Sequence, residues 1–473
     1  MLKKFMVFQV NKLFDNKSHI YFVGIGGIGM SAIARYFKSI GKEVSGYDKT
    51  PTPLTDELQS EGISVHFEDN LGKADSVYSD VKSKDSVLVV YTPAIPKDHS
   101  ELNFFIDKHY ELKKRSEVLG MITKSSYTIG IAGTHGKTTT SSMVAHILKS
   151  AGMNCTAFLG GITKNYGTNL LLGNSVGKKY TVVEADEYDR SFLALYPDLA
   201  VITSMDADHL DIYGDHSYMV ESYRLYAQQV KQGGRLIYKS GLQLSDLEVE
   251  KNTYSIHGDA DFNGDNIRIA DHRYHFDWKS AETLISDLTS EMPGLHNVEN
   301  AVAAIAVAKH VGIANDIIKS ALATYNGVKR RFDYQLRTSD CVFIDDYAHH
   351  PEELRACISS VKELYPGKRV TGIFQPHLYS RTRDFAEGFA KSLSMLDCLI
   401  LLDIYPAREL PIPGITSEII FNEVTCEKYQ CSKEIALEVL EAHPSDVVLT
   451  LGAGDIDQLV QPIKQQLQKA VKS

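Results

Sequence analysis

The sequence of 473 residues has few of the features that mark secreted or membrane-spanning proteins. Its six cysteines contain no C-x-x-C pair, which argues against a disulfide framework or a zinc site and favours reduced thiols. No apolar run approaches the roughly 18 residues that a membrane-spanning helix needs. The apolar start is interrupted at Gln9, and no small-residue cleavage site follows it. We therefore expect a soluble, cytoplasmic protein without a membrane partner.

An excess of positive charge is also missing, since 60 acidic and 50 basic side chains give a net charge of −10. A general nucleic-acid-binding protein is usually basic, so we expect no nucleic-acid partner. Internal repeats and low-complexity tracts are absent as well. With 43% hydrophobic residues, and a prior of roughly 150 residues per domain, the chain has material for about three domains.

The most informative stretch is residues 133–140, which read Gly-Thr-His-Gly-Lys-Thr-Thr-Thr. An apolar, β-prone run at 127–132 precedes it, and a helical stretch at 138–150 follows it. This order suits a nucleotide phosphate, because glycine lets backbone N–H groups approach the oxygens and the helix N-terminus adds partial positive charge. Lys137 would neutralise the β- and γ-phosphates, and Thr138 could hold Mg²⁺.

The loop departs from the usual phosphate-loop pattern at one position. A glycine is expected five residues before Gly136, where the sequence has Ile131, so the motif is shortened to G-x-x-G-K-T. A glycine- and threonine-rich turn with a chance lysine would give the same letters. The strand before the loop and the helix after it favour phosphate binding.

A second glycine motif, Gly-Ile-Gly-Gly-Ile-Gly-Met at residues 24–30, follows a short apolar strand at 19–23. A helix to residue 40, a strand at 43–47 and then Asp48 come next, as in dinucleotide-binding domains. The pattern itself requires only a diphosphate on a helix N-terminus, so it fits NAD and a UDP-sugar equally well. A tight turn without any ligand is a further interpretation.

Acidic residues follow two further apolar strands. Residues 180–184 deliver Glu184 to a strand end, and three more acids follow within five residues. His209 lies among three aspartates after a strand at 199–203. Near a triphosphate such groups would coordinate Mg²⁺ or position its water, whereas a solvated acidic loop and a structural histidine are the plain alternatives.

The rest of the middle segment is less regular. Residues 231–290 are polar, and alternating stretches such as 268–276 predict small antiparallel strands. Asn297 and Asn300 precede an alanine-rich helix at 301–308. Their amide groups could read an adenine edge or cap that helix.

The last segment, from about residue 328, predicts a third α/β sheet. Strands are expected at 342–344, 369–374, 398–402 and 447–451, and each is followed by a polar loop. Because ligands bind at the carboxyl ends of parallel strands, these loops predict an active edge.

The order of the motifs resembles the Mur ligase family, the ATP-dependent amide-forming enzymes of peptidoglycan synthesis, over nearly the whole chain. The resemblance rests on ten motifs in sequence: GIGGIGM, GTHGKTTT, EADEYD, DADHLD, GLHNVENA, KRRF, DDYAHHP, QPHLYSRT, DIYPARE and GAGD. It implies an α/β protein of three domains: a UDP-sugar-binding Rossmann-like domain at 1–114, a central ATP-binding P-loop domain at 115–327 and a Rossmann-like C-terminal domain at 328–473. The C-terminal domain is expected to close over ATP and to bind the amino acid.

The resemblance also implies roles for individual residues. UDP-N-acetylmuramate would contact the first glycine loop and the acid after it, namely Gly24, Gly26, Gly27, Gly29 and Asp48. ATP would contact Gly133, Thr134, His135, Gly136, Lys137, Thr138, Thr139, His296, Asn297, Asn300, Arg331 and Asp346. Mg²⁺ would bind Thr138, Glu184 and His209, and the amino acid or the phosphate would lie near His350, Arg381 and Arg383. The implied catalytic set is Lys137, Glu184, His209, Arg331, His350 and Arg381.

The activity that the resemblance implies is ATP-dependent ligation of L-alanine to the carboxylate of UDP-N-acetylmuramate through an acyl phosphate. This activity would serve cell wall biogenesis, and through it cell shape and cell division. The protein is expected to be a monomer or a homodimer. Several members of the family also use a carbamylated lysine. Its counted position in this chain is Arg224, which cannot be carbamylated, so a second Mg²⁺ site is not implied.

Three alternatives stay open. A related ligase attaches a recycled tripeptide to the same UDP-sugar, and only the amino-substrate pocket separates the two activities. A nicotinamide-dependent dehydrogenase with an accessory ATPase domain would leave the clusters at 345–351 and 375–382 without a role. A non-catalytic ATP switch would not need charged groups after so many strands.

Overall fold

A computed structural model describes residues 12–72, 84–174, 176–206, 213, 215–407 and 409–470. Within these ranges the protein is an α/β structure with three sheets, which confirms the predicted fold class. Of the helices in this part of the chain, none is both long and apolar enough to cross a membrane.

The chain divides into two compact units. The first comprises Met1–Asn263, Trp278–Leu284 and Asn300–Leu322, and the second comprises Gly264–Asp277, Ile285–Glu299 and Ala323–Ser473. The three domain ranges expected from the sequence stay a prediction.

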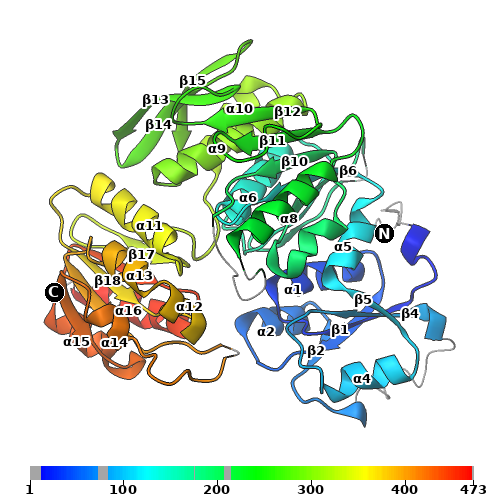
Figure 1. Ribbon diagram of the computed structural model, residues 1–473, viewed down its shortest axis with the longest axis horizontal. Helices are drawn as coiled ribbons and strands as arrows, with labels where there is room; N and C mark the ends of the chain where they lie inside the picture. Colours follow the sequence, from blue (N-terminus) through cyan, green and yellow to red (C-terminus); the bar gives the residue numbers. More distant parts are fainter. Residues whose placement is uncertain are drawn as a thin grey trace, which may run out of the picture. The chain divides into compact units, whose positions relative to one another are not determined.

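The N-terminal sheet has parallel strands in the order β3-β2-β1-β4-β5. Its elements are η1 (Lys12–Phe14), β1 (His19–Val23), α1 (Ile28–Ser39), β2 (Glu43–Tyr47), α2 (Pro53–Ser60), β3 (Ser64–His66), η2 (Lys84–Ser86), β4 (Val87–Tyr91), α4 (Ser100–Asp107), β5 (Glu111–Lys114) and α5 (Arg115–Thr123). Ile20 and Phe22 join the core that contains Phe37 of α1, whereas Tyr21 joins the core that contains Phe105 of α4. Helices α1 and α4 accordingly lie on opposite sides of the strands in Figure 1. Burial of both faces explains why β1 and β4 are nearly continuous apolar runs.

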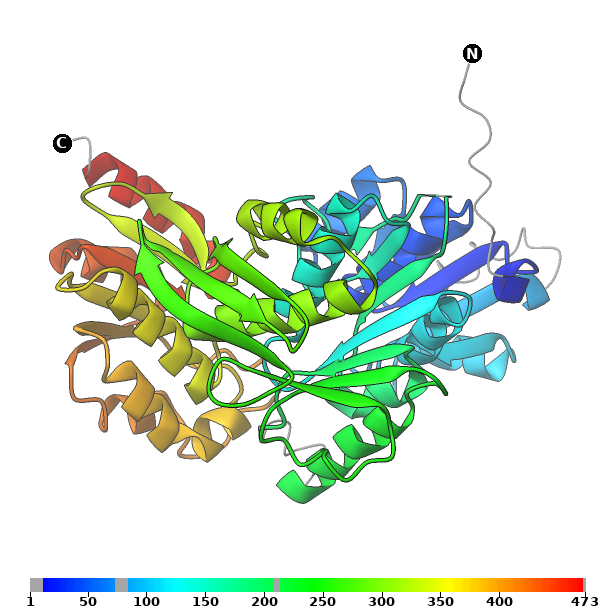
Figure 2. The ribbon, with the colours of Figure 1, turned by 90° about the horizontal axis from the view of Figure 1, so that it is seen from above.

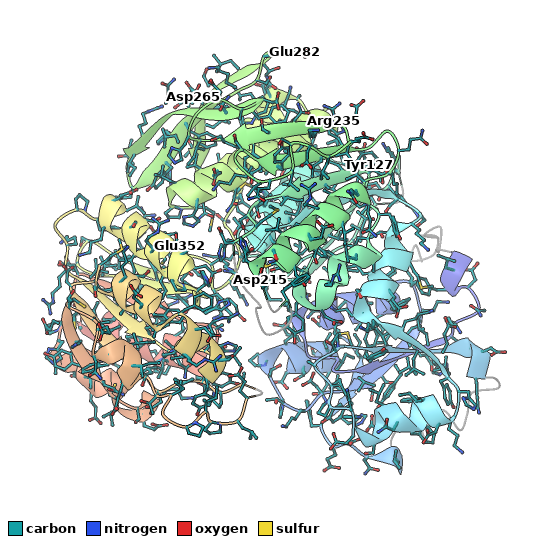
Figure 3. The ribbon with its side chains drawn as sticks, in the orientation of Figure 1. Tyr127, Asp215, Arg235, Asp265, Glu282 and Glu352 are labelled. Atoms are coloured by element: carbon teal, nitrogen blue, oxygen red, sulfur yellow. The ribbon has the colours of Figure 1, made fainter. Side chains whose placement is uncertain are left out.

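The central sheet has the strand order β15-β14-β13-β12-β11-β10-β6-β9-β7-β8. Its elements are β6 (Tyr127–Ala132), α6 (Lys137–Ser150), β7 (Cys155–Phe158), β8 (Leu170–Leu171), β9 (Tyr180–Glu184), η3 (Tyr188–Ala194), β10 (Leu199–Ile202), α8 (His216–Gln228), β11 (Arg235–Lys239), β12 (Lys251–Ser255), β13 (Phe262–Ala270), β14 (Arg273–Lys279), β15 (Leu284–Ser290), α9 (Leu295–His310) and α10 (Asn315–Thr324). Strands β7, β9, β6, β10 and β11 are parallel, so they begin at one edge and end at the other. Figure 3 places Tyr127 and Arg235, the first residues of β6 and β11, at the same edge.

The stretch at 268–276, predicted to form small antiparallel strands, spans the turn between β13 and β14. Asp271 and His272 have φ angles of 51° and 55°. Positive φ at both central residues is the geometry of a two-residue hairpin turn. Figure 2 shows the green ribbons of β13, β14 and β15 running side by side.

The C-terminal sheet has the order β16-β17-β21-β18-β19-β20, and all pairs except β16 with β17 are parallel. Its elements are β16 (Asp333–Arg337), β17 (Val342–Asp346), α11 (Pro351–Leu364), β18 (Val370–Phe374), α12 (Tyr379–Asp384), α13 (Ala386–Leu393), β19 (Cys398–Leu401), α14 (Glu418–Phe421), β20 (Glu427–Gln430), η4 (Lys433–Ile435), α15 (Ala436–Ala442), β21 (Val447–Leu451), η5 (Asp455–Leu459) and α16 (Val460–Ala470). The four strands expected in this segment are β17, β18, β19 and β21.

Arg35 of α1 links the N-terminal sheet to the central sheet. Its side chain is only 8% exposed, and its Nη1 donates to Asn169 Oδ1 at 2.5 Å. Its other nitrogens bind Glu57 and Glu61 at 2.7 to 3.0 Å. Asn169 is fully buried and donates in turn to the carbonyl of Ile28 at 2.6 Å. This network fixes the helix that follows the first glycine motif.

Replacing Arg35 by Met should destabilise the protein by about 2 kcal/mol, because the change removes charge-assisted hydrogen bonds and leaves the buried Asn169 oxygen without its donor. Lys38→Met on the same helix is the matched control. Lys38 is exposed and binds only the Gly62 carbonyl, so its loss should cost at most about 0.5 kcal/mol. Urea unfolding measures both, and equal effects would contradict the structural role of Arg35.

Candidate functional site

The phosphate loop connects the end of β6 to the start of α6. Gly133 has a φ of 136° and Gly136 a φ of 84°. A Cβ atom on Gly133 would lie 2.0 Å from Thr203 Oγ1, so only glycine fits there. The backbone N–H of His135 donates to Ser204 Oγ at 2.8 Å. The residues that follow β10 therefore fix the loop from its side.

Lys137 is held by the loop that it completes. Its Nζ donates to the carbonyl of Gly133 at 2.7 Å and lies 2.8 Å from both carboxylate oxygens of Glu187. Burial lowers the pKa of Lys137, but the neighbouring carboxylates, above all Glu187, raise it by more, so the ammonium stays charged. Burial raises the pKa of Glu187 to about 7, against the opposing effect of Lys137. The lysine is thus charged and positioned before any phosphate arrives.

Thr138 and Glu184, two of the three predicted Mg²⁺ ligands, lie together. Thr138 Oγ1 donates to Glu184 Oε1 at 2.9 Å, and Glu184 Oε2 accepts from the backbone N–H of Gly160 at 2.9 Å. Hydroxyl and carboxylate oxygens are the hard donors that Mg²⁺ prefers, so the pair fits this ion. The third ligand, His209, lies outside the described residues. In the ranges that are described, no group of three or more His, Cys, Asp or Glu side chains could hold a metal.

The first glycine motif and Glu184 open into one cavity of about 580 Å³. The cavity is lined by all five residues expected to contact the UDP-sugar, Gly24, Gly26, Gly27, Gly29 and Asp48. Asp48 is also bound to the loop itself, because its Oδ2 accepts from the N–H of Gly26 at 2.7 Å. A space of this size accommodates a small-molecule ligand. The predicted sugar site and the predicted metal site therefore adjoin each other.

Arg115 lines the same cavity and was not predicted. It begins α5, and its Nη2 lies 2.8 Å from Asp186 Oδ2. The basic run at 113–115, which ends β5 and begins α5, is the sequence signal that could have identified it. Its guanidinium balances one of the three acids, Asp48, Glu184 and Asp186, that line the cavity.

The residues expected to contact adenine lie inside α9, so the alternative in which they cap this helix is wrong. Asn297 Nδ2 donates to the carbonyl of Pro293 at 2.6 Å. Asn300 Oδ1 accepts from Thr140 Oγ1 at 3.2 Å. A Cβ atom on Gly136 would lie 2.5 Å from the same Asn300 oxygen. Asn300 therefore contacts the phosphate loop, and His296 lies one residue into the helix.

Arg331 and Asp346, both expected to contact ATP, belong to one cluster in the second unit. Asp346 accepts from the backbone N–H groups of Phe332 at 2.6 Å and Ala348 at 2.8 Å. Arg331 lies 3.5 Å from Glu353. Burial raises the pKa of Asp346 to about 6, although Arg331 and the two N–H groups lower it. The cluster offers a carboxylate and a guanidinium side by side.

The three residues expected at the amino-acid site differ in exposure. His350 is buried, caps α11 by accepting from Glu352 N at 3.4 Å, and packs 4.9 Å from the ring of Phe385. Figure 3 labels Glu352 on this helix. Arg381 of α12 is also buried. Arg383 is exposed and bonds to its chain neighbour, so its predicted role depends on a change of partner.

Arg224 occupies the counted position of the carbamylated lysine. Its Nη1 and Nη2 bind Asp246 at 2.8 and 2.6 Å, and Nη1 also donates to the carbonyl of Gln243 at 2.7 Å. The guanidinium of this α8 residue is therefore engaged in an ion pair with Asp246, which lies between β11 and β12.

Three models of the Mur ligase family match successive parts of the chain. The model "Mur ligase family, catalytic domain" matches residues 19–127, "Mur ligase middle domain" matches 131–308, and "Mur ligase, glutamate ligase domain" matches 330–454. Together they cover each of the three sheets.

Individual relatives match over the full length. A UDP-N-acetylmuramate–L-alanine ligase from Parabacteroides distasonis is 53% identical, covering 96% of this chain and 98% of that protein, and one from Flavobacterium johnsoniae is 49% identical, covering 96% and 98%. The crystal structure of a UDP-N-acetylmuramate-alanine ligase from Thermotoga maritima has a TM-score of 0.80 at 27% identity, covering 96% of this chain and 99% of that one. A murein peptide ligase from Psychrobacter arcticus has a TM-score of 0.70, covering 95% and 98%, but at 21% identity it shows the fold alone.

Lys137→Met should weaken the binding of a nucleoside triphosphate by about 10- to 100-fold, the usual effect of losing a charge-assisted hydrogen bond. The variant should still fold, because the pKa of Glu187 rises further once its cation is gone and the buried carboxyl becomes neutral. Equilibrium binding of a fluorescent ATP analogue measures the effect. Lys149→Met, in the last turn of the same helix, is the control, and an equal loss there would contradict the role of Lys137.

Asp345→Asn should flatten the pH dependence of stability. Burial raises the pKa of Asp345 from 3.8 to about 6, so the folded state binds more protons than the unfolded state between these values. Stability therefore falls as the pH rises from about 4 to about 6, by at most about 3 kcal/mol from this group. Urea unfolding at several pH values should show a smaller fall in Asp345→Asn, while exposed Asp340→Asn keeps the full fall. Identical pH profiles would refute the shift.

Proposed function

The chain belongs to the Mur ligase family, and we propose that it joins L-alanine to the carboxylate of UDP-N-acetylmuramate while ATP is converted to ADP and phosphate. The observation that carries the proposal is the cavity shared by the first glycine motif and Glu184. It lets a sugar-nucleotide substrate reach the point where the phosphate loop and its carboxylate meet. Full-length identity of about 50% to two alanine-adding ligases supports the choice of substrates.

The reaction needs ATP because a carboxylate is a poor acyl donor, whose leaving group would be oxide. Transfer of the γ-phosphoryl group to the carboxylate gives an acyl phosphate, whose leaving group is phosphate. The amine of L-alanine then attacks the carbonyl carbon, and the tetrahedral intermediate collapses to the amide and inorganic phosphate. The protein's main tasks are to position the groups and to stabilise negative charge.

The phosphate loop supplies most of this stabilisation in the proposal. The loop from Gly133 to Thr139 would receive the phosphates, chiefly through the backbone N–H groups at the start of α6. Lys137 would exchange Glu187 for phosphate oxygens. Thr138, Glu184 and His209 would hold Mg²⁺, which would neutralise charge on the transferring group. The four glycines of the first glycine motif and Asp48 would bind the UDP-sugar.

The remaining roles are proposed for residues beyond the loop. Asn297, Asn300 and His296 would contact the base of ATP, Asp346 its ribose and Arg331 its phosphates. His350, Arg381 and Arg383 would serve L-alanine or the released phosphate. We propose the three domain ranges 1–114, 115–327 and 328–473 for these tasks. We propose a cytoplasmic location, since the reaction consumes ATP. A monomer or a homodimer is proposed as well.

The proposal predicts phosphate release from ATP only when UDP-N-acetylmuramate, L-alanine and Mg²⁺ are all present. Product mass should increase by one alanyl residue, and removal of Mg²⁺ with EDTA should abolish the release. Glycine and L-serine, offered in turn, measure selectivity. The tripeptide L-Ala-γ-D-Glu-diaminopimelate tests the rival activity of a recycling ligase.

The outcomes separate the two activities. If the tripeptide were the only amino substrate that supported turnover, the protein would be assigned to the recycling reaction and the proposal for L-alanine would be refuted. If a preparation that still binds the ATP analogue released no phosphate with any amino substrate, ligation would be refuted altogether. Lys137→Met should lose the activity, because the charge that the lysine neutralises grows in the transition state.

A further inference from the structure

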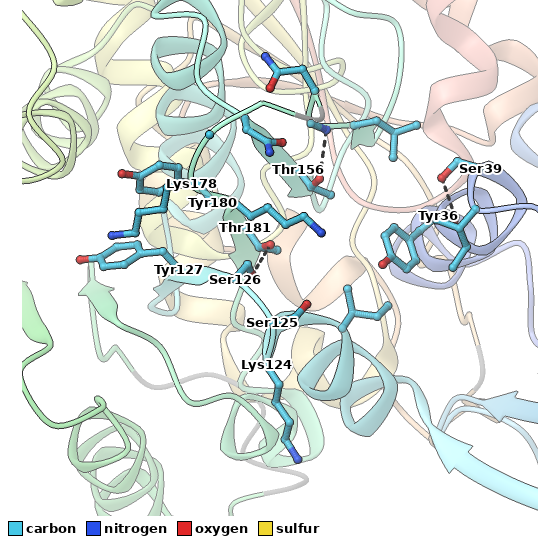
Figure 4. Close-up of a pocket in the computed structure, with 18 residues that line it drawn as sticks. Tyr36, Ser39, Lys124, Ser125, Ser126, Tyr127, Thr156, Lys178, Tyr180 and Thr181 are labelled. Carbon is cyan, nitrogen blue, oxygen red and sulfur yellow. Dashed lines mark hydrogen bonds between the residues drawn. The ribbon is translucent and has the colours of Figure 1, made fainter. Parts of the chain in front are cut away.

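A second cavity, of about 560 Å³, lies where strands β6 and β9 begin. Figure 4 shows Tyr127 and Tyr180, the first residues of the two strands, on one side of it, and Tyr36 and Ser39 of α1 on the other. The phosphate loop follows the last residue of β6. A strand of six residues is roughly 20 Å long, so the two sites are well separated.

The charged side chains that line this cavity are all basic. Lys124, Lys178 and Lys179 are among its 18 lining residues, none of which is acidic. In a chain with a net charge of −10, this is a local reversal of sign. The neighbouring carboxylate of Asp198 already binds Lys231 at 2.7 Å, so it offsets little of the positive charge. A cavity of this kind attracts anions.

Lys178 is positioned without being neutralised. Its Nζ lies 3.9 Å from the centre of the Tyr127 ring and 5.2 Å from that of Tyr180. The two rings are 5.4 Å apart and inclined by 59°. Cation–π contacts hold an ammonium group in place but leave its charge available to a ligand. The rings also offer an apolar surface to an organic group.

Asn154 supplies a second, independent sign of a ligand. Its side chain is 7% exposed and lines the cavity. Its Nδ2 atom has no hydrogen-bond acceptor among the described residues. A Cβ atom on Gly173 would lie 2.2 Å from its Oδ1, so the glycine leaves room for this amide. Buried amide groups are normally paired. This Nδ2 atom is itself buried, so a ligand oxygen would satisfy it once the amide turns toward the cavity.

We propose that this cavity binds a small phosphate monoester. Its phosphate would lie against Lys178 and the neighbouring lysines, and its organic part against the tyrosine rings. One of its oxygens would accept from Asn154 Nδ2 after the amide turns toward the cavity. A phosphate carries nearly two negative charges, which suits several ammonium groups better than a single carboxylate does. The cavity volume fits a ligand of this size. The site shares no lining residue with the proposed ligase site, so it does not depend on that activity.

Binding of phenyl phosphate to the full chain tests the proposal, measured by calorimetry and by ligand-observed NMR. Lys178→Glu should weaken binding by at least about tenfold, because it replaces a charge-assisted contact with repulsion. Lys137→Met should bind as the wild type does, which excludes the phosphate loop as the binding site. Lys391→Gln, an exposed lysine of α13, is the matched control and should also be unchanged. Phenol should not bind.

Several results would overturn the proposal: no binding to the wild type, equal binding by Lys178→Glu, loss of binding in Lys137→Met, or full displacement by ATP. Inorganic phosphate that binds as tightly as phenyl phosphate would refute the contact with the tyrosine rings. Lys178 is exposed, so its variant should fold, and its thermal unfolding should match the wild type. Asn154→Leu, which keeps the buried volume, should also bind more weakly.

Discussion

The pairing of β6 with β9 is the constraint on which the candidate site depends. The two strands are parallel, and Ile131 lies opposite Glu184 in their register. On its other side Ile131 pairs with Val201 of β10. Because parallel strands end at the same edge, this register brings the phosphate loop and the carboxylate of Glu184 together. The contact between Thr138 and Glu184 at 2.9 Å follows from it.

The same register explains the shortened motif. Ile131 stands where a longer phosphate loop would have glycine, but it is a fully buried residue in the middle of the sheet. A glycine there would weaken the strand and remove core packing without widening the loop. The loop proper begins at Gly133, where the backbone turns with a positive φ. The departure from the usual pattern is therefore a later start of the loop, and the helix that begins at Lys137 is retained.

The sequence predicts best those elements whose two faces are buried. Strands β1, β6 and β21 have the bounds expected from their apolar runs. Strand β5, with the charged sequence Glu-Leu-Lys-Lys, gives no such run because it is an edge strand with one free side, and it was not expected. Motif order predicted the meeting of Thr138 with Glu184. It could not predict the contact of Arg115 with Asp186 or of Asn300 with Thr140, because the spacing along the chain does not determine which distant side chains meet.

Buried charge at the site is balanced locally rather than by solvent. Lys137 keeps its proton because Glu187 and its acidic neighbours outweigh the cost of burial, while the same burial raises the pKa of Glu187 to about 7. A phosphate dianion that reaches Lys137 must therefore displace a carboxylate whose charge is already unfavourable. Protonation or withdrawal of Glu187 would leave a cation with two backbone carbonyls as its remaining partners. Such a group gains more from a phosphate than a solvated lysine does, because water has already been removed from it. The ion pair with Glu187 thus keeps Lys137 charged and desolvated, which is the state that phosphoryl transfer requires.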